Sequence, residues 1–371
     1  MWRTAHEVTS VPAPTYLIES TPVYLNSAWR NIGTTASGAF HNNTVLDGEE
    51  ILVDRSCASL AAGAAAQGIN GGPFYVLGGR HTLELRVDSG GAVAESDETD
   101  NNIAHQWSWR AGFLPAGYHG HRDTPPPAPQ GGWSSIPAGQ DKYDNCVGIG
   151  FTSGANWSVV YIYGPDATTD YDLRLFDRTT NATDGYKSPL AWSTRRGRGV
   201  EAAVVNGHNV GVHDYEIGIY RYAGDDGFYF EHAAGQALAW GNSIGGSFEQ
   251  DEMIQAFDVS VPAEGVGTVT VTLQMATTDP SVVLAWVDRT FQVGGLTDLT
   301  SNAATDENGR ARLHVPPRAR SRSAPGSRQP DRSRACPSAP RSRRPSPAAA
   351  IAGGAGEHER VVAGTLQVRA E

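Results

Sequence analysis

The segment from Gly78 to Asp88 constrains the fold more than any other part of the sequence. Its apolar residues alternate with polar ones, which is the period of a β-strand with one buried face. The apolar set is Leu83, Leu85 and Val87, and the polar set is Thr82, Glu84 and Arg86. Ser89-Gly90-Gly91 follows directly, and we expect it to supply the positive-φ positions of a tight hairpin. The segment therefore predicts antiparallel sheet with one face in a core.

Segments of the same kind recur along the chain, and Gly, Asn and Asp clusters separate them. Short strands joined by turns at such spacing are typical of a sandwich or jelly roll. The 43 Gly residues fit this pattern and argue against long helices. The further expected strands span residues 103–109, 157–163, 171–177, 213–220, 267–274 and 282–286. We expect residues 103–109 to place Trp107 and Trp109 on one face.

The predicted fold class is all-β, with two consecutive antiparallel sandwiches. The first is expected to be immunoglobulin-like and the second to be a sandwich or jelly roll. A Pro-rich stretch, residues 124–129, favours a stiff, extended connection between them. The predicted organisation is a lead-in at 1–19, a first sandwich at 20–110, a linker at 111–140, a second sandwich at 141–315 and a tail at 316–371.

Charge separates the tail from the rest of the chain. The formal net charge is −11, yet residues 316–350 contain nine Arg and a single Asp. The remaining residues are therefore strongly acidic, which disfavours nucleic acid as a partner. An Arg/Pro/Ser-rich stretch cannot form a core and is predicted to be disordered. It is either a plain linker or an out-of-frame product of GC-rich DNA, and a nucleic-acid-binding tail is the less favoured interpretation.

The three cysteines, Cys57, Cys146 and Cys336, lack metal-ligand spacing. A Cys57–Cys146 disulfide is one interpretation, and two separate buried thiols is the favoured one. No apolar run reaches the about 20 residues that span a bilayer. The N-terminus lacks the pattern of a signal peptide. Either the protein is cytosolic or the chain lacks its true start.

Residues 20–110 resemble the CARDB family, a cell-adhesion-related, immunoglobulin-like domain of bacterial surface proteins. Asn31-Ile-Gly33 with Ala39-Phe40, and Leu60-Ala-Ala-Gly63, fit its earlier blocks. Its closing block is the most specific, and the matching residues are Asp88, Val93, Glu95, Ser96, Glu98 and Asn101. Asp100 stands where the family often has Asn, and Asn102 extends the pair.

Residues 141–235 are more faintly similar to the pre-peptidase C-terminal domain, through the strand Thr169–Asp177. Both resemblances imply export to the outside of a bacterial cell, and neither implies catalysis. The CARDB resemblance implies a role in adhesion or in presenting other domains.

The same closing block holds five carboxylates, whose repulsion a cation could offset. They are Asp88, Glu95, Asp97, Glu98 and Asp100. Calcium takes about six to eight oxygen ligands, so it is the candidate ion, although the spacing differs from a helix-loop-helix site. The favoured alternative is that carboxylates and amides bind turn backbone while the rest face solvent. Asp166, Asp170 and Asp172 form a second acidic group, with a solvated strand edge as the favoured interpretation.

Two further motifs point to chemistry. Gly241-Asn-Ser243-Ile-Gly245 fits the nucleophile elbow of hydrolases, which requires a strand, a turn and a helix. No alternating strand–helix pattern surrounds Ser243, so a chance match is favoured. His119 and His121 could chelate a metal, but a stable zinc site uses about three or four ligands, and incidental histidines are favoured.

Aromatic residues leave a lectin-like interpretation open, since exposed rings can stack on sugars. The candidates are Trp107, Trp109, Trp133, Trp157, Trp192, Trp240 and Trp286. Burial in sandwich cores is the commoner role of such side chains. The sequence thus predicts a non-catalytic accessory module of a secreted or surface bacterial protein, with no catalytic, cofactor or metal residues assigned. The alternatives are a carbohydrate-binding protein and the non-catalytic remainder of a secreted peptidase. The partner is unknown, with a surface glycan or protein as the candidates.

Overall fold

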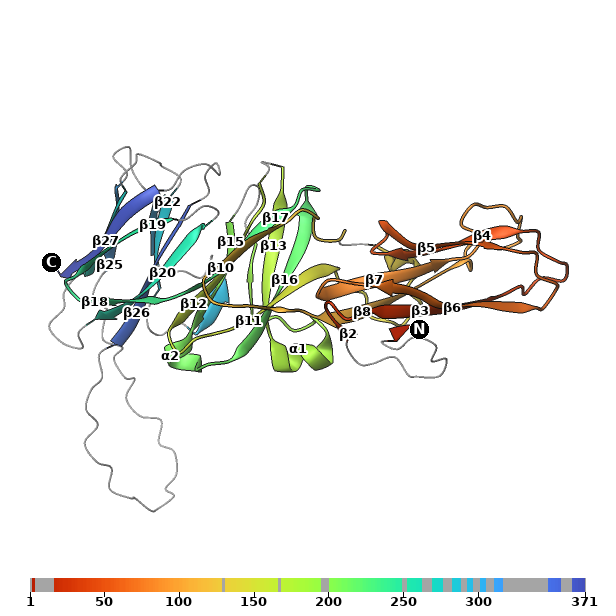
Figure 1. Cartoon of the computed structure of the whole chain (residues 1–371), viewed down its shortest axis with the longest axis horizontal. Helices are drawn as coiled ribbons and strands as arrows, with labels where there is room; N and C mark the ends of the chain where they lie inside the picture. Colours follow the sequence, from red (N-terminus) through yellow and green to blue (C-terminus); the bar gives the residue numbers. More distant parts are fainter. Residues whose placement is uncertain are drawn as a thin grey trace, which may run out of the picture. The chain divides into compact units, whose positions relative to one another are not determined.

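The regular elements of the computed structural model are almost all β-strands (Figure 1). It describes residues 2–3, 17–128, 131–165, 168–194, 200–248, 252–261, 269–275, 282–287, 292–295, 301–304, 310–315, 346–354 and 362–370. The helices in these residues are short: η1 (Trp133–Ser135), α1 (Arg178–Asp184) and α2 (Gly207–Val210). The all-β fold class is confirmed. Two compact units form, the first from residues 1–234 with 292–298, and the second from 235–291 with 299–371.

The first sandwich of unit 1 has two facing sheets. One sheet has the order β1-β3-β6, and the other includes the order β7-β4-β5 with β8 beside β7. The strands are β1 (Trp2–Arg3), β2 (Leu17–Ile18), β3 (Val23–Arg30), β4 (Phe40–Leu46), β5 (Glu50–Cys57), β6 (Ala65–Phe74), β7 (Gly79–Arg86) and β8 (Asn102–Arg110). Its core is a cluster that includes Leu17, Val23, Leu46, Val76 and Trp109.

Leu83 in strand β7 packs against this core together with Trp107, as its predicted face requires. The opposite face is covered as well, because Thr82 and Glu84 are buried whereas Leu83 and Leu85 are half-buried. Trp107 and Trp109 therefore meet the same cluster, as predicted. The tight hairpin prediction was wrong in one respect. Strands β7 and β8 pair from Arg86 and Asn102 inward, so a long loop joins them. The positive φ angles lie at Asp88 and Gly91, and Gly91 N donates to Asp88 O at 2.9 Å within that loop.

The second half of unit 1 is another sandwich. One sheet has the order β10-β17-β12-β15-β23, and the facing strands have the order β14-β13-β16-β11. Its strands are β9 (Phe113–Leu114), β10 (Tyr118–Arg122), β11 (Cys146–Thr152), β12 (Trp157–Tyr163), β13 (Asp170–Asp177), β14 (Ala191–Ser193), β15 (Val200–Asn206), β16 (Asp214–Ala223), β17 (Phe228–Ala234) and β23 (Val293–Gly295).

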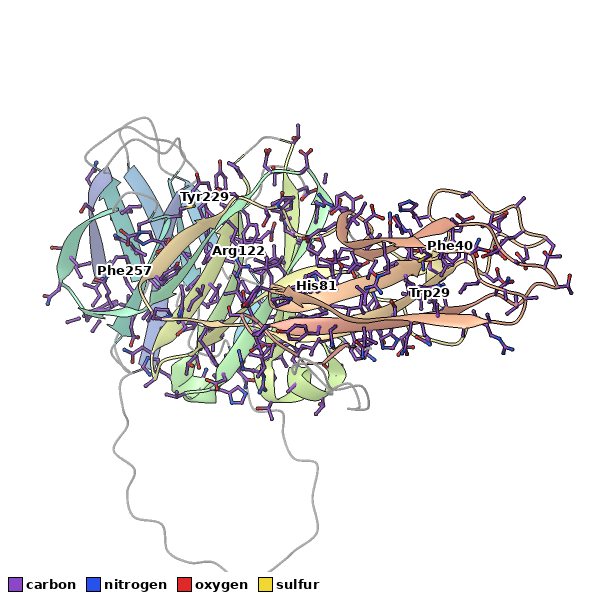
Figure 2. All side chains as sticks on the ribbon, turned by 45° about the vertical axis from the view of Figure 1, so that its right-hand side comes forward. Trp29, Phe40, His81, Arg122, Tyr229 and Phe257 are labelled. Atoms are coloured by element: carbon purple, nitrogen blue, oxygen red, sulfur yellow. The ribbon has the colours of Figure 1, made fainter. Side chains whose placement is uncertain are left out.

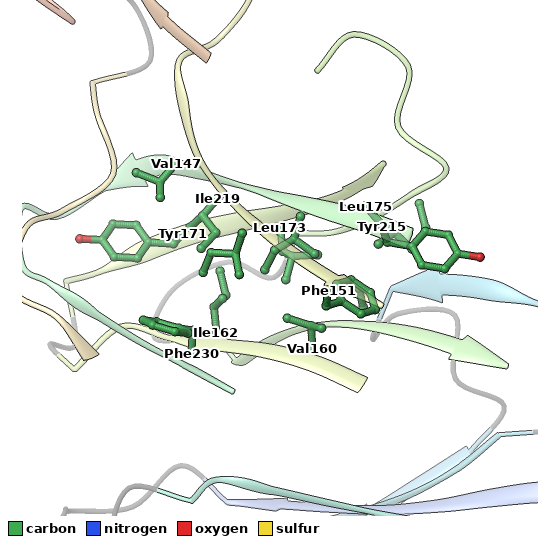
Figure 3. Packing of buried hydrophobic residues seen from close by; sticks show 14 of the residues in the cluster. Val147, Phe151, Val160, Ile162, Tyr171, Leu173, Leu175, Tyr215, Ile219 and Phe230 are labelled. Atoms are coloured by element: carbon green, nitrogen blue, oxygen red, sulfur yellow. The ribbon is translucent and has the colours of Figure 1, made fainter. Parts of the chain in front are cut away.

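Side chains from both sheets fill the space between them (Figure 3). Phe151 and Ile217 come from one sheet, Val160 and Phe230 from the other, and none is more than 6% exposed. Full burial on such a scale is the main stabilising contribution to a sandwich of this size.

Unit 2 also consists of strands. They are β18 (Gln236–Ala239), β19 (Ser243–Phe248), β20 (Ile254–Val261), β21 (Val269–Met275), β22 (Val282–Val287), β24 (Ser301–Ala304), β25 (Arg310–Val315), β26 (Ser346–Gly354) and β27 (Val362–Ala370). Their orders are β18-β20-β26-β22-β24 and β19-β27-β21-β25.

Several strands lie where the sequence predicts irregular chain. Strands β9 and β10 and helix η1 fall within the predicted linker at 111–140, and β26 and β27 within the predicted tail at 316–371. Residues 316–345, the Arg-rich part of that tail, lie outside the described residues. The boundaries of the domains stay a prediction.

Candidate functional site

Asp88 is buried, and its carboxylate closes the β7–β8 loop. Its oxygens accept hydrogen bonds from Ala92 N at 2.9 Å and from Val93 N at 2.8 Å. Its own N–H donates to Asn42 Oδ1 at 3.1 Å. These bonds satisfy backbone donors that the turn would otherwise leave unpaired. The Asp88 carboxylate therefore stabilises the conformation of the β7–β8 loop.

The following acidic residues divide between bonded and unbonded side chains. Glu98 accepts from Glu95 N at 2.9 Å and from Asn101 Nδ2 at 3.1 Å, and Asp97 accepts from Thr99 N at 2.9 Å. Within the described residues, no group of three or more His, Cys, Asp or Glu side chains is placed to hold a metal ion. The calcium interpretation of this run stays untested.

An open groove of about 650 Å³ lies beside this loop, in the first sandwich. Its walls come from the end of β3 with the loop after it, the end of β7, the β7–β8 loop and the start of β8. The larger apolar side chains in the wall are Trp29, Ile32, Phe40, Leu60, Leu85, Val87, Val93 and Ile103. Trp29 and Phe40 are labelled in Figure 2. The groove falls in the size range of about 300–1,000 Å³ that suits ligands.

Asp88, Glu95, Asp97 and Asp100 also line the groove, with Arg30 as the single basic residue of its lining. Glu95 and Asp100 are exposed, and neither carboxylate makes a hydrogen bond or ion pair to another described residue. The groove thus combines an apolar wall with an unpaired negative rim. The sequence pointed to its acids but not to the groove.

The second structural feature is a main-chain joint between the two sandwiches of unit 1. Strand β11 pairs with β7, with Cys146 opposite Arg80 and Val147 opposite Gly79. The joint continues where Gly148 N donates to Gly78 O at 2.6 Å. One sheet thereby runs through both sandwiches.

Gly79 makes this close approach feasible. Its φ is +129°, and a Cβ there would overlap the carbonyl oxygen of Cys146. A glycine inside a strand often marks such an approach of two backbones. The Gly78-Gly79 pair was therefore a sequence signal for the joint. These residues were interpreted only as the start of strand β7, and that signal was missed.

A buried carboxylate of the second sandwich accepts a hydrogen bond from the segment that follows β8. Glu216, which is 1% exposed, lies 3.0 Å from Arg178 Nη1 and accepts from Ala111 N at 3.3 Å. Burial raises the pKa of Glu216, although Asn181 and Arg178 favour its charged form. Glu19 adds a second tie, since it accepts from Gly112 N at 2.6 Å and pairs with Arg122 at 3.3 Å.

The second acidic group lies on a strand edge. Asp170 and Asp172 belong to β13, whose partner β14 covers only Leu173–Leu175. Burial raises the pKa of Asp172 to about 6, and the neighbouring carboxylates Asp170 and Asp144 add to the rise while Arg174 opposes it. Asp166 lies outside the described residues.

The structure gives neither Ser243 the geometry of a nucleophile elbow nor His119 and His121 the geometry of a metal site. Ser243 begins strand β19 after the turn that follows β18, so the helix of a nucleophile elbow is absent there. His119 and His121 lie on β10, where the His121 ring packs 4.3 Å from the Tyr229 ring and its Nδ1 lies 3.1 Å from Asp123.

A Ser–His–Asp arrangement that sequence reasoning missed lies on the exposed face of β4 and β5. His41 Nδ1 is 3.4 Å from Asp54 Oδ1, and His41 Nε2 is 3.5 Å from Ser56 Oγ. Both distances are long for catalytic hydrogen bonds, which measure about 2.6–3.2 Å. The His41 and Asp54 side chains are 56% and 63% exposed, so the water-excluded setting of a hydrolase site is missing.

The cysteines and tryptophans are mostly structural. Cys57 and Cys146 are free thiols, and burial raises the pKa of Cys146 to about 11. Trp109 and Trp157 are fully buried, whereas Trp192 on β14 is 58% exposed. Trp107, Trp133 and Trp240 are half-buried, and Cys336 and the Trp286 side chain lie outside the described residues. No helix in the described part of the chain is long and apolar enough to cross a membrane.

The described residues define an all-β protein of packed sandwiches. Residues 7–105 match the CARDB family model, which confirms the resemblance of the first sandwich. A search of curated proteins finds no match.

Three solved structures give weak likenesses. A domain provisionally described as part of a cell surface protein of Methanosarcina acetivorans is 20% identical over 26% of this chain and 83% of that chain, with a TM-score of 0.23. A carbohydrate-binding module of the β-sandwich superfamily is 7% identical over 59% and 93%, with a TM-score of 0.15. The Bacteroides ovatus protein SGBP-B, in complex with a mixed-linkage heptasaccharide, is 9% identical over 97% and 100%, with a TM-score of 0.14.

Proposed function

We propose that this chain is a non-catalytic accessory module of a secreted or surface bacterial protein, which holds other domains in a fixed arrangement for adhesion or presentation. The observation that carries the proposal is the main-chain joint between β7 and β11. Domains that move independently are usually linked by flexible segments with few crossing contacts. Here a continuous sheet, a hydrogen bond from Ala111 N to the buried Glu216 and the Arg122–Glu19 ion pair cross between the sandwiches.

The match of residues 7–105 to CARDB supports the location and class of this role. Rigid coupling suits a spacer, because a stiff module keeps the attached domains in place. No conformational entropy is then lost in ordering the module when an attached domain binds its partner.

The stiffness can be measured by pulsed electron spin resonance between two labels in the full chain. Ile32 in the first sandwich and Val212 in the second are 77% and 66% exposed, so labels there should not disturb packing. We expect one narrow distance distribution. A broad distribution, like that of domains on a flexible linker, would contradict a fixed arrangement. Surface exposure is tested separately, by protease treatment of intact cells that make the full protein.

A further inference from the structure

Trp192 differs from the other tryptophans whose side chains the structure describes, because its ring is exposed. It is 58% exposed, whereas Trp109 and Trp157 are fully buried and the remaining described ones are half-buried. An indole left in water lacks the hydrophobic stabilisation that its burial would give. The ring of Trp192 is therefore available to a ligand.

The ladder between β13 and β14 fixes the face on which this ring lies. Trp192 is directly opposite Arg174, while the neighbouring pair, Leu175 and Ala191, belongs to the core of the second sandwich. Directly opposed residues of an antiparallel pair project from the same face, and neighbours along a strand project from opposite faces. Trp192 and Arg174 therefore lie together on the outer face of the sheet, away from the core.

The Arg174 side chain is held in position on this face. Its Cζ lies 4.0 Å from the centroid of the Tyr220 ring, and its Nη2 lies 3.3 Å from Asp144 Oδ2. The Arg174 and Asp144 side chains are still 33% and 34% exposed, so both present polar atoms to solvent. Stacking and ion pairing restrict the rotation of the guanidinium, so less conformational entropy is lost when it binds a ligand.

Asp172 extends the polar border of the ring. It precedes Arg174 by two residues on β13, so the two side chains share the outer face. A carboxylate accepts hydrogen bonds, and a guanidinium donates them. The outer face thus presents a flat apolar ring with hydrogen-bond donors and acceptors beside it.

This combination matches the chemistry of a pyranose sugar. One face of a pyranose ring carries C–H groups, whose partial positive charge is attracted to the negative face of an indole. The hydroxyl groups point outward from the edge of the sugar, where neighbouring hydroxyls donate to a carboxylate and accept from a guanidinium. A protein partner would instead require an apolar surface around the ring, since charged residues are depleted at the centre of protein interfaces.

The charge of this face narrows the class of sugar. Asp172 interacts electrostatically with Asp144, Asp170 and Arg174, so three carboxylates surround one guanidinium. Acidic sugars would be repelled by the excess negative charge, whereas neutral sugars would not.

We propose that the outer face of β13 and β14 binds a neutral pyranose unit of an oligosaccharide, which stacks on Trp192 and hydrogen-bonds through its hydroxyl groups to Arg174 and Asp172. The inference goes beyond the proposed function, because a rigid spacer needs no ligand. The absence of sugar binding would therefore leave the main-chain joint untouched.

The first test is an array of immobilised hexasaccharides of glucose, mannose, galactose and xylose, with a hexamer of galacturonic acid beside them. We expect the labelled full chain to bind at least one neutral hexasaccharide more strongly than the acidic one. Raising the salt concentration from about 50 to about 300 mM should not weaken this binding, because a neutral ligand has no charge for salt to screen. Binding to none of the neutral members, or to the acidic hexamer alone, would overturn the proposal.

Variants of the full chain locate the bound sugar by calorimetric titration with the tightest neutral hexasaccharide of the array. Trp192→Ala should weaken binding about tenfold, and Trp192→Phe, which keeps a smaller aromatic face, about threefold. Arg174→Met keeps an unbranched apolar stem over Tyr220 but removes the guanidinium, and it should weaken binding about tenfold. Tyr75→Ala removes a ring that is 67% exposed in the first sandwich, and it is the matched control. Unchanged affinity in both Trp192→Ala and Arg174→Met would overturn the site.

Hydroxyl-radical footprinting of the wild-type chain needs no variant and checks the same site. The neutral hexasaccharide should lower the oxidation of Trp192 at least about threefold, because a stacked sugar shields the face of the indole. Oxidation of Tyr75 should stay the same. Equal oxidation of Trp192 with and without bound sugar would place the sugar elsewhere and overturn the proposal.

Discussion

His81 Nδ1 lies 2.7 Å from Asp47 Oδ2 at a site in the first sandwich where neither residue is more than 5% exposed. The other carboxylate oxygen of Asp47 accepts from Thr82 N at 2.7 Å. Burial alone would disfavour a charged imidazole, but the Asp47 carboxylate outweighs it, and the pKa of His81 is raised. The pair ties the turn after β4 to strand β7.

Removing the charge from Asp47 should weaken its contact with His81. Breaking a buried pair by neutralising one partner costs about 3–5 kcal/mol, so Asp47→Asn should speed amide hydrogen exchange in β4 and β7. Because the folded pKa of His81 is raised, its contribution is complete below about pH 6.5, the unfolded value, and is lost as the pH rises through the folded value. We expect the wild type to lose stability over that range and the variant to lose less. Equal pH dependence in both proteins would contradict the assignment.

Gly79→Ala should break the joint between the sandwiches. The added methyl group would overlap the carbonyl of Cys146 and would impose strain at φ +129°. We expect a loss of more than about 2 kcal/mol in urea unfolding of unit 1, together with a broader spin-label distance distribution. Gly90→Ala is the control, because a Cβ at Gly90 meets nothing within 4 Å. A rigid Gly79→Ala protein of normal stability would contradict the role given to this pairing.

Asp88→Ala should disorder the β7–β8 loop. It leaves the N–H groups of Ala92 and Val93 without their acceptor, at a cost of about 1–3 kcal/mol. Limited proteolysis should then cut within residues 89–101. Glu95→Ala, whose carboxylate has no described partner, should leave the cleavage rate unchanged. Calcium should not protect the wild-type loop if Asp88 serves the turn, and protection by calcium would favour the metal interpretation.

Asp172→Asn should change the pH dependence of stability. With the folded pKa at about 6, above the usual value of 3.8, the folded protein binds the proton more tightly than the unfolded chain. Stability therefore falls as pH rises from about 4 to about 6, and stays lower above that range. Half-exposure reduces the effect, so we expect Asp172→Asn to raise the melting temperature at pH 7.5 by only about 2 °C and to have little effect at pH 4. Scanning calorimetry at both pH values measures it. A rise of equal size at both would exclude the carboxylate charge as the cause.

Runs of β-branched and aromatic residues between turn residues were enough to predict many strands. The expected strand at 157–163 coincides with β12, and that at 171–177 differs from β13 by a single residue. Such segments carry their own signal, since a short run of this composition is visible in any window of a few residues. Strand β10 escaped prediction because Tyr118–Arg122 has glycine and histidines where apolar residues would mark a buried face.

The groove and the joint could not be predicted in this way. Gly79 meets Val147 only after the intervening chain has folded, and no local period reports such a pairing. The groove forms where β3, β7, the β7–β8 loop and β8 meet, and their meeting follows from pairing partners rather than from composition. The acidic run was visible in the sequence. Only the hydrogen bonds in the structure show that the Asp88 carboxylate is bonded to the loop and that the Asp100 carboxylate is not.

The shared sheet also limits how this chain can be recombined. Because the family match ends at residue 105, the first sandwich looks like a domain that could be exchanged on its own by a cut at that residue. A cut there would remove Trp109 from the core and leave β7 without β11. It would also separate Glu19 from Gly112 N and from Arg122, which belong to the piece that remains. Natural or engineered exchange should therefore keep both sandwiches of unit 1 together, residues 1–234 with 292–298.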